Sequence, residues 1–130
     1  MNKNQEKLAF YFDVEIKKRE LFSRLTVAAL LAERGHHVFI GRYIDINSMK
    51  KIIPKATIVK KSVRFKNITI VNDLKNSGYK IVNMEEEGVL VGSENEYIGV
   101  DMPPEAVKLP DKHLLWGERQ ADYLTNIYPE

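Results

Sequence analysis

Short apolar runs of strand length alternate along this chain with longer segments in which apolar residues recur every three or four positions. The runs of strand length are Leu8–Phe12, His37–Ile40, Ala56–Lys60, Tyr79–Met84 and His113–Trp116. Strands that alternate with helices in this way are typical of a parallel sheet with helices on both faces. We therefore predict an α/β fold with a Rossmann-like parallel sheet of about five strands flanked by helices.

The longest predicted helix covers Arg19–Arg34 and ends before Gly35, which can take the left-handed turn that often closes a helix. Its apolar residues at spacings of three and four are Leu21, Leu25, Ala28 and Ala32. Further apolar residues widen this stripe, namely Phe22, Ala29 and Leu30. A stripe of that width predicts a helix that is mostly buried.

Shorter helices are predicted in four places: Asn47–Ile53, Ile68–Leu74, a turn from Pro103 to Glu105, and Gly117–Ile127. Gly78 follows the second of these. The segment Val89–Val100 is less regular and contains two glycines, so we predict a loop or a hairpin there.

The composition predicts one domain over residues 1–130 without disulfides, because the chain contains no cysteine. Lys and Arg number 20 against 18 Asp and Glu, and this near balance argues against a nucleic-acid binder. Met1–Lys7 lacks the apolar core of a signal peptide, and the longest apolar run, Val27–Ala32, is too short to span a bilayer. We expect a cytoplasmic protein, and association with the inner face of the membrane through a partner stays open.

The first candidate for chemistry is the segment Asp13–Glu20, which follows the first strand where ligands bind in open α/β sheets. It contains no glycine, so a phosphate loop for a nicotinamide or flavin cofactor is excluded and we predict no cofactor. Three cations, Lys17, Lys18 and Arg19, stand at the positive end of the predicted helix. Either a bound anion neutralises them, or Glu15 and Glu20 do so within a solvated loop.

The second candidate is Glu85-Glu86-Glu87-Gly88, at the end of the fourth predicted strand. Crowding of three carboxylates raises the pKa of at least one of them, which suits a general acid or base. Strand alternation directs Glu86 away from Glu85 and Glu87. The alternative is a polar loop without a role, because charge runs are common at strand ends.

The third candidate is Trp116–Gln120, after the fifth strand. Trp116 is the only tryptophan, and its ring could stack on a sugar or a base, although a core position is the more common one. His36, His37 and His113 lack metal-ligand spacing with a carboxylate, so we predict no metal site.

Four segments together resemble the N-terminal part of the bacterial surface carbohydrate biosynthesis protein family: Asp13–Leu21, Gly35–Arg42, Glu85–Gly88 and Trp116–Ala121. Members of this family are two-domain GT-B glycosyltransferases, distantly similar to the Kdo transferases of capsule and lipopolysaccharide assembly. The resemblance covers roughly Leu8–Pro129. It implies that this chain is the N-terminal, acceptor-side half of such an enzyme.

The family patterns V-E-x-K-x-R-E-L, D-E-E-G and W-G-x-x-Q-A fall on segments that start at Val14, Glu85 and Trp116, with Glu85 in place of the aspartate. In the Kdo-type relatives the carboxylate before the glycine is a suspected nucleophile. The resemblance therefore implies Glu87 as nucleophile or base and Glu86 as its support. The residues implied in substrate binding are Glu15, Lys17, Arg19, Gly88, Trp116 and Gln120.

The implied partners are a nucleotide sugar and a glycan or lipid-linked acceptor. In relatives the nucleotide sugar binds mainly through a C-terminal domain, before which this chain ends, so we expect the isolated chain to be inactive. The alternative is a stand-alone Rossmann-like binding or interaction module without catalysis. The sequence leaves both functions open.

Overall fold

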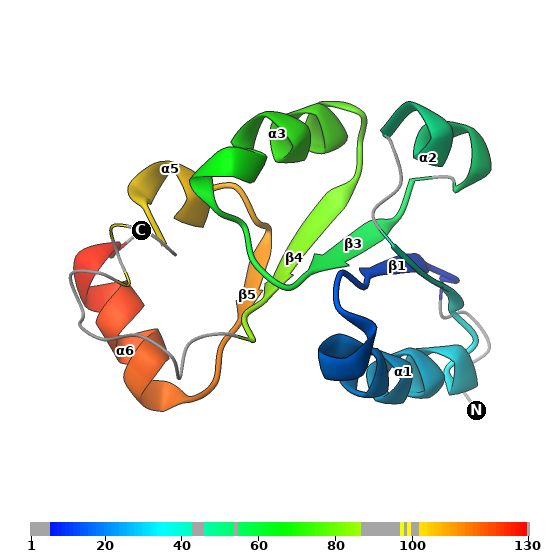
Figure 1. The fold of residues 1–130 in the computed structure, drawn as a ribbon, viewed down its shortest axis with the longest axis horizontal. Helices are drawn as coiled ribbons and strands as arrows, with labels where there is room; N and C mark the ends of the chain where they lie inside the picture. Colours follow the sequence, from blue (N-terminus) through cyan, green and yellow to red (C-terminus); the bar gives the residue numbers. More distant parts are fainter. Residues whose placement is uncertain are drawn as a thin grey trace.

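The computed structural model describes residues 6–42, 46–53, 55–86, 97, 99 and 102–129. Five strands form one fully parallel sheet in the order β2-β1-β3-β4-β5 (Figure 1). The strands are β1 (Ala9–Asp13), β2 (His37–Gly41), β3 (Thr57–Lys60), β4 (Lys80–Met84) and β5 (Lys112–Leu114). The predicted parallel, Rossmann-like α/β fold is confirmed, and each strand lies within two residues of its predicted position.

Helices cover both faces of the sheet. They are α1 (Lys17–Glu33), α2 (Ile46–Ile52), the 3-10 turn η1 (Phe65–Asn67), α3 (Ile68–Asn76), α5 (Pro104–Val107) and α6 (Glu118–Ile127). In Figure 1, α2 and α3 lie on one side of the sheet, α1 lies on the other, and α6 lies beyond β5. Gly35 and Gly78 follow α1 and α3 with φ of +86°, the left-handed conformation predicted for a helix end. Most of the predicted loop or hairpin at 89–100 lies outside the described residues.

The larger core lies between the sheet and the helices α2 and α3. Tyr11, Ile58 and Ile81 occupy matching positions on β1, β3 and β4, and each is at most 3% exposed. They pack against apolar residues of the two helices and their flanks, among them Met49, Ile53, Val71 and Leu74. Period-two alternation on three neighbouring strands therefore forms one continuous apolar layer.

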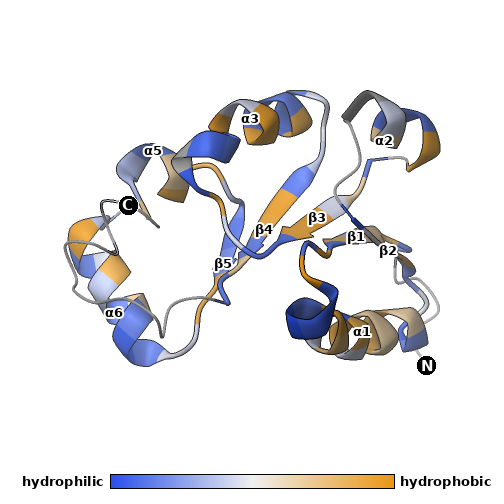
Figure 2. Cartoon of the chain, viewed as in Figure 1, coloured by the Kyte–Doolittle hydropathy of each residue, from blue (hydrophilic) through white to orange (hydrophobic). Residues whose placement is uncertain are grey.

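The α1 side of the sheet differs, and here the prediction of a mostly buried helix is wrong. The buried residues of α1 are Glu20, Arg24 and Ala28, whereas Phe22 is 84% exposed and Leu25 and Leu30 are about half exposed. In Figure 2 the first turn of α1 is hydrophilic, although most of the helix beyond it is apolar. Apolar residues surround most of the helix, so periodicity could not identify the narrow stripe, spaced by four residues, that contacts the sheet.

Since all strands run the same way, their carboxyl ends lie along one edge of the sheet. The chain continues from β1 to β2 on one side, and β3 lies on the other side of β1. Ligands of open α/β sheets bind at this edge, and in particular where the strand order reverses, which is here between β1 and β3. Within the described part of the chain, no helix has both the length and the apolarity to cross a membrane.

Candidate functional site at the carboxyl edge of the sheet

One cavity of about 430 Å³ lies beyond the ends of β4 and β5, beside the first turns of α1. We call it the Trp116 cavity. Its lining combines charged, polar and apolar side chains, including Arg19, Ser23, Glu85, Glu86, Leu115 and Trp116. The structure thus brings Arg19, Glu86 and Trp116, which come from the three candidate segments of the sequence, to one cavity.

Glu86 lies against α1, where its carboxylate forms an ion pair with the fully buried Arg24. Oε1 of Glu86 is 3.4 Å from Nη2 of Arg24 and 3.3 Å from the hydroxyl of Ser23. Nη1 of Arg24 lies 2.8 Å from the sulfur of Met84. Burial lowers the pKa of Arg24, and the nearby carboxylates of Glu86, Glu20 and Asp13 act in the opposite direction. An arginine stays protonated in any case, so a permanent cation positions Glu86 at the wall of the cavity.

Trp116 is 57% exposed, so of the two alternatives that the sequence left open for this residue, a core position is excluded. Its backbone N–H donates to Oε1 of Gln120 at 2.8 Å, and Nε2 of Gln120 donates to the hydroxyl of Tyr97. These bonds tie the loop before α6 to the first turn of that helix. Gln120 therefore holds the backbone of Trp116, and the indole lines the cavity.

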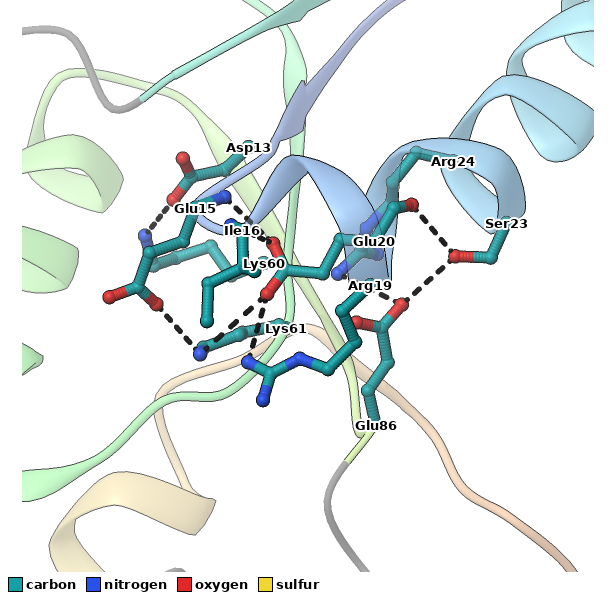
Figure 3. Close-up of polar contacts among 10 residues, drawn as sticks. All are labelled: Asp13, Glu15, Ile16, Arg19, Glu20, Ser23, Arg24, Lys60, Lys61 and Glu86. Carbon is teal, nitrogen blue, oxygen red and sulfur yellow. Dashed lines mark hydrogen bonds and ion pairs between the residues drawn. The ribbon is translucent and has the colours of Figure 1, made fainter.

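Of the three cations at the start of α1, Arg19 contacts the buried carboxylate of Glu20 (Figure 3). Oε2 of Glu20 accepts the backbone N–H groups of Glu15 and Ile16 at 2.7 and 3.2 Å. Oε1 lies 3.1 Å from Nη2 of Arg19 and 3.7 Å from Nζ of Lys61. For Arg19 the chain therefore supplies the counter-charge itself, which is one of the two interpretations that the sequence left open.

Burial by itself would raise the pKa of the Glu20 carboxyl. The two backbone donors and the nearby Arg19 and Lys61 outweigh burial, so the pKa of Glu20 is lowered. Glu20 is ionised at neutral pH and fully buried. It contacts Arg19 of the Trp116 cavity on one side and Lys61 on the other.

A second cavity, of about 490 Å³, lies where the strand order reverses between β1 and β3. We call it the basic cavity. Its charged lining consists of Asp13, Glu15, Arg42, Lys60, Lys61, Arg64 and Lys66. Nζ of Lys60 lies 2.9 Å from Asp13, and Nζ of Lys61 lies 2.7 Å from Glu15.

The sequence analysis gave no role to Lys60-Lys61-Ser62-Val63-Arg64, the end of β3 and the loop after it, which form much of this cavity. A signal was present, because three cations within five residues directly follow a strand rich in β-branched residues. Of the residues implied in binding, Glu15 lines the basic cavity, and Lys17 is exposed and lines neither cavity.

The remaining candidates concern catalysis and metals. Glu87 and Gly88 lie outside the described residues. Across the described ranges, no three His, Asp or Glu side chains are grouped so that they could bind a metal ion. His113 instead lies 3.1 Å from Asn83 through Nδ1 and 2.8 Å from the carbonyl of Val107 through Nε2. It therefore connects β5 to β4 and α5.

Comparison with protein-family models, curated proteins and solved structures finds no match to this chain.

Proposed function

We propose that this chain is the acceptor-side domain of a glycosyltransferase that builds bacterial surface polysaccharide. One observation carries the proposal: the Trp116 cavity combines an exposed indole, a positioned carboxylate and a guanidinium. A sugar ring has an apolar C–H face and a rim of hydroxyls. An aromatic side chain with polar groups at its edge complements both parts.

Three of the lining residues, Trp116, Glu86 and Arg19, contact the sugar in this proposal. The indole of Trp116 stacks on the sugar ring of the acceptor. Glu86, fixed by Arg24 and Ser23, accepts hydrogen bonds from sugar hydroxyls, and Arg19 donates to ring or carboxylate oxygens. Glu87 acts as nucleophile or base, a role that comes from the family resemblance and from its place next to Glu86. The nucleotide sugar binds mainly through the second domain that the resemblance implies.

A saccharide-binding experiment with the 130-residue chain tests the proposal. Trp116 is the only tryptophan, so its fluorescence reports on this cavity directly. Titration with neutral and acidic mono- and oligosaccharides should quench or shift the emission and saturate. Glu86→Gln keeps the size of the side chain and removes its charge, and it should weaken binding roughly tenfold, as expected for a lost charge-assisted hydrogen bond.

Phe22→Ala is the matched control, because Phe22 is an exposed aromatic residue on α1 that does not line the Trp116 cavity. It should leave the titration unchanged. If no saccharide alters the emission, or if Glu86→Gln and Phe22→Ala behave alike, the proposed sugar site is wrong. Saccharide binding without transfer in an enzyme that also contains the second domain would favour the binding module instead.

A further inference from the structure

We infer that the basic cavity between the ends of β1 and β3 binds the phosphate group of a phosphomonoester. This site is separate from the Trp116 cavity, and the inference does not depend on sugar transfer. Five cationic side chains line the cavity against two carboxylates. The cavity volume of about 490 Å³ lies within the range of small-molecule sites.

Each of the two carboxylates that line the cavity forms an ion pair with a lysine. Asp13 lies 2.9 Å from Lys60, and Glu15 lies 2.7 Å from Lys61 (Figure 3). Arg42 and Lys66 also line the cavity, and neither forms an ion pair with any described residue. Lys61 lowers the pKa of Glu15, and Lys66 contributes a smaller effect in the same direction, so the positive charge of Lys66 acts within the cavity. Among the described lining residues, positive charge therefore exceeds negative charge, which favours the binding of an anion.

The chemistry of the lining favours phosphate. A phosphomonoester carries a charge of about −1.5 to −2 at neutral pH and three acceptor oxygens. Arg42 and Arg64 present planar guanidinium groups, which match phosphate oxygens in pairs. Ser62 lines the same cavity, is only 5% exposed, and has a hydroxyl that can donate.

The fold supports the same site. The cavity lies at the reversal of strand order, where open α/β sheets bind their ligands. Lys66 and Asn67 of its lining directly precede α3, whose positive end adds to the field of the cations. Lys60, only 7% exposed and paired with Asp13, forms part of the cavity wall. Three loops that follow parallel strands thus converge on one basic pocket.

Titration of the chain with glucose 1-phosphate, followed by the backbone amide resonances of Ser62 and Asn67, tests this inference. We expect saturable shifts that inorganic phosphate competes away and that glucose does not produce. Lys66→Gln and Arg42→Gln should each weaken binding roughly tenfold, the effect of losing a hydrogen bond between charged groups. Lys80→Gln is the matched control, because this exposed lysine begins β4 at the opposite edge of the sheet.

A parallel arm with phosphatidic acid vesicles distinguishes a soluble phosphomonoester from a lipid headgroup, since both present the same group. Vesicle binding that glucose 1-phosphate competes away would show that the site accepts a lipid headgroup, whereas binding of glucose 1-phosphate without vesicle binding would assign the site to a soluble phosphomonoester. Two results would overturn the inference: no saturable shift at Ser62 and Asn67, or equal weakening by Lys66→Gln and Lys80→Gln. Sugar binding is read from Trp116 and phosphate binding from Ser62 and Asn67, so failure of one proposal is distinguishable from failure of the other.

Discussion

The two faces of the sheet bury different kinds of side chain. On the α3 side, Tyr11, Ile58 and Ile81 lie in one apolar layer against the helices. On the α1 side, the helix buries Glu20 and Arg24 completely and leaves Phe22 exposed. Apolar burial is non-directional, whereas a buried charge requires partners at defined distances and loses hydration energy.

This difference matches the position of the two cavities. Glu20 contacts Lys61 and Arg19, and Arg24 contacts Glu86, so the buried charges of α1 orient side chains that line both cavities. The α3 side provides most of the apolar core. We conclude that the α3 side mainly stabilises the fold. The α1 side buries less apolar surface and instead positions residues that line the two cavities.

The largest effect is expected for Glu20→Leu, which keeps a similar volume and removes the buried carboxylate. It should lower the free energy of unfolding by about 3–5 kcal/mol, because it leaves two backbone N–H groups and two cations without their acceptor. Urea denaturation measures this change. Arg19→Gln, at the partly exposed partner, should cost less than about 1 kcal/mol. An equal cost for both variants would show that burial of Glu20 is irrelevant.

The pH dependence of this difference tests whether it arises from charge. The pKa of Glu20 is lowered in the folded state, so its ionised form stabilises the fold above the unfolded pKa of about 4.3. This contribution is lost as the pH falls from that value through the lower folded pKa. The difference in the free energy of unfolding between wild type and Glu20→Leu should therefore become smaller at acidic pH. If this difference in the free energy of unfolding stayed constant with pH, the destabilisation would arise from packing and not from charge.

A slightly smaller effect is expected for Ile81→Ala on the opposite face. Ile81 is fully buried in the larger core, and truncation of such a residue costs about 2–5 kcal/mol through lost burial and a cavity. The difference in the free energy of unfolding between wild type and Ile81→Ala should not change with pH over the range in which the difference for Glu20→Leu becomes smaller. If both differences became smaller by the same amount in acid, the proposed contrast between an apolar face and a charged face of the sheet would be wrong.

The smallest effect is expected for Phe22→Ser on α1. Phe22 is 84% exposed, so the substitution should change the free energy of unfolding by no more than about 0.5 kcal/mol. The same denaturation measurement checks it. A loss as large as that of Ile81→Ala would show that Phe22 is covered in solution, which would restore the buried helix that the sequence pattern suggested.

Much of the fold was predictable from local patterns. Short apolar runs placed the five strands within two residues, and the glycines after α1 and α3 marked the helix ends. The carboxyl edge of the sheet followed from parallel strands, so the meeting of Arg19, Glu86 and Trp116 was foreseeable. The burial of Arg24 was not predicted, and the exposure of Trp116 was one of two alternatives, because residue type gives only an average tendency to be buried.

By itself, the sequence determined the elements and their parallel arrangement, since both follow from periodicity over a few residues. Only the tertiary structure decided the strand order, which places β3 beside β1 and so brings Lys60 and Lys61 to Asp13 and Glu15. It also decided which stripe of α1 faces the sheet, and thereby paired Arg24 with Glu86. These contacts join residues far apart in the chain, and their formation depends on the packing of whole elements rather than on any local pattern.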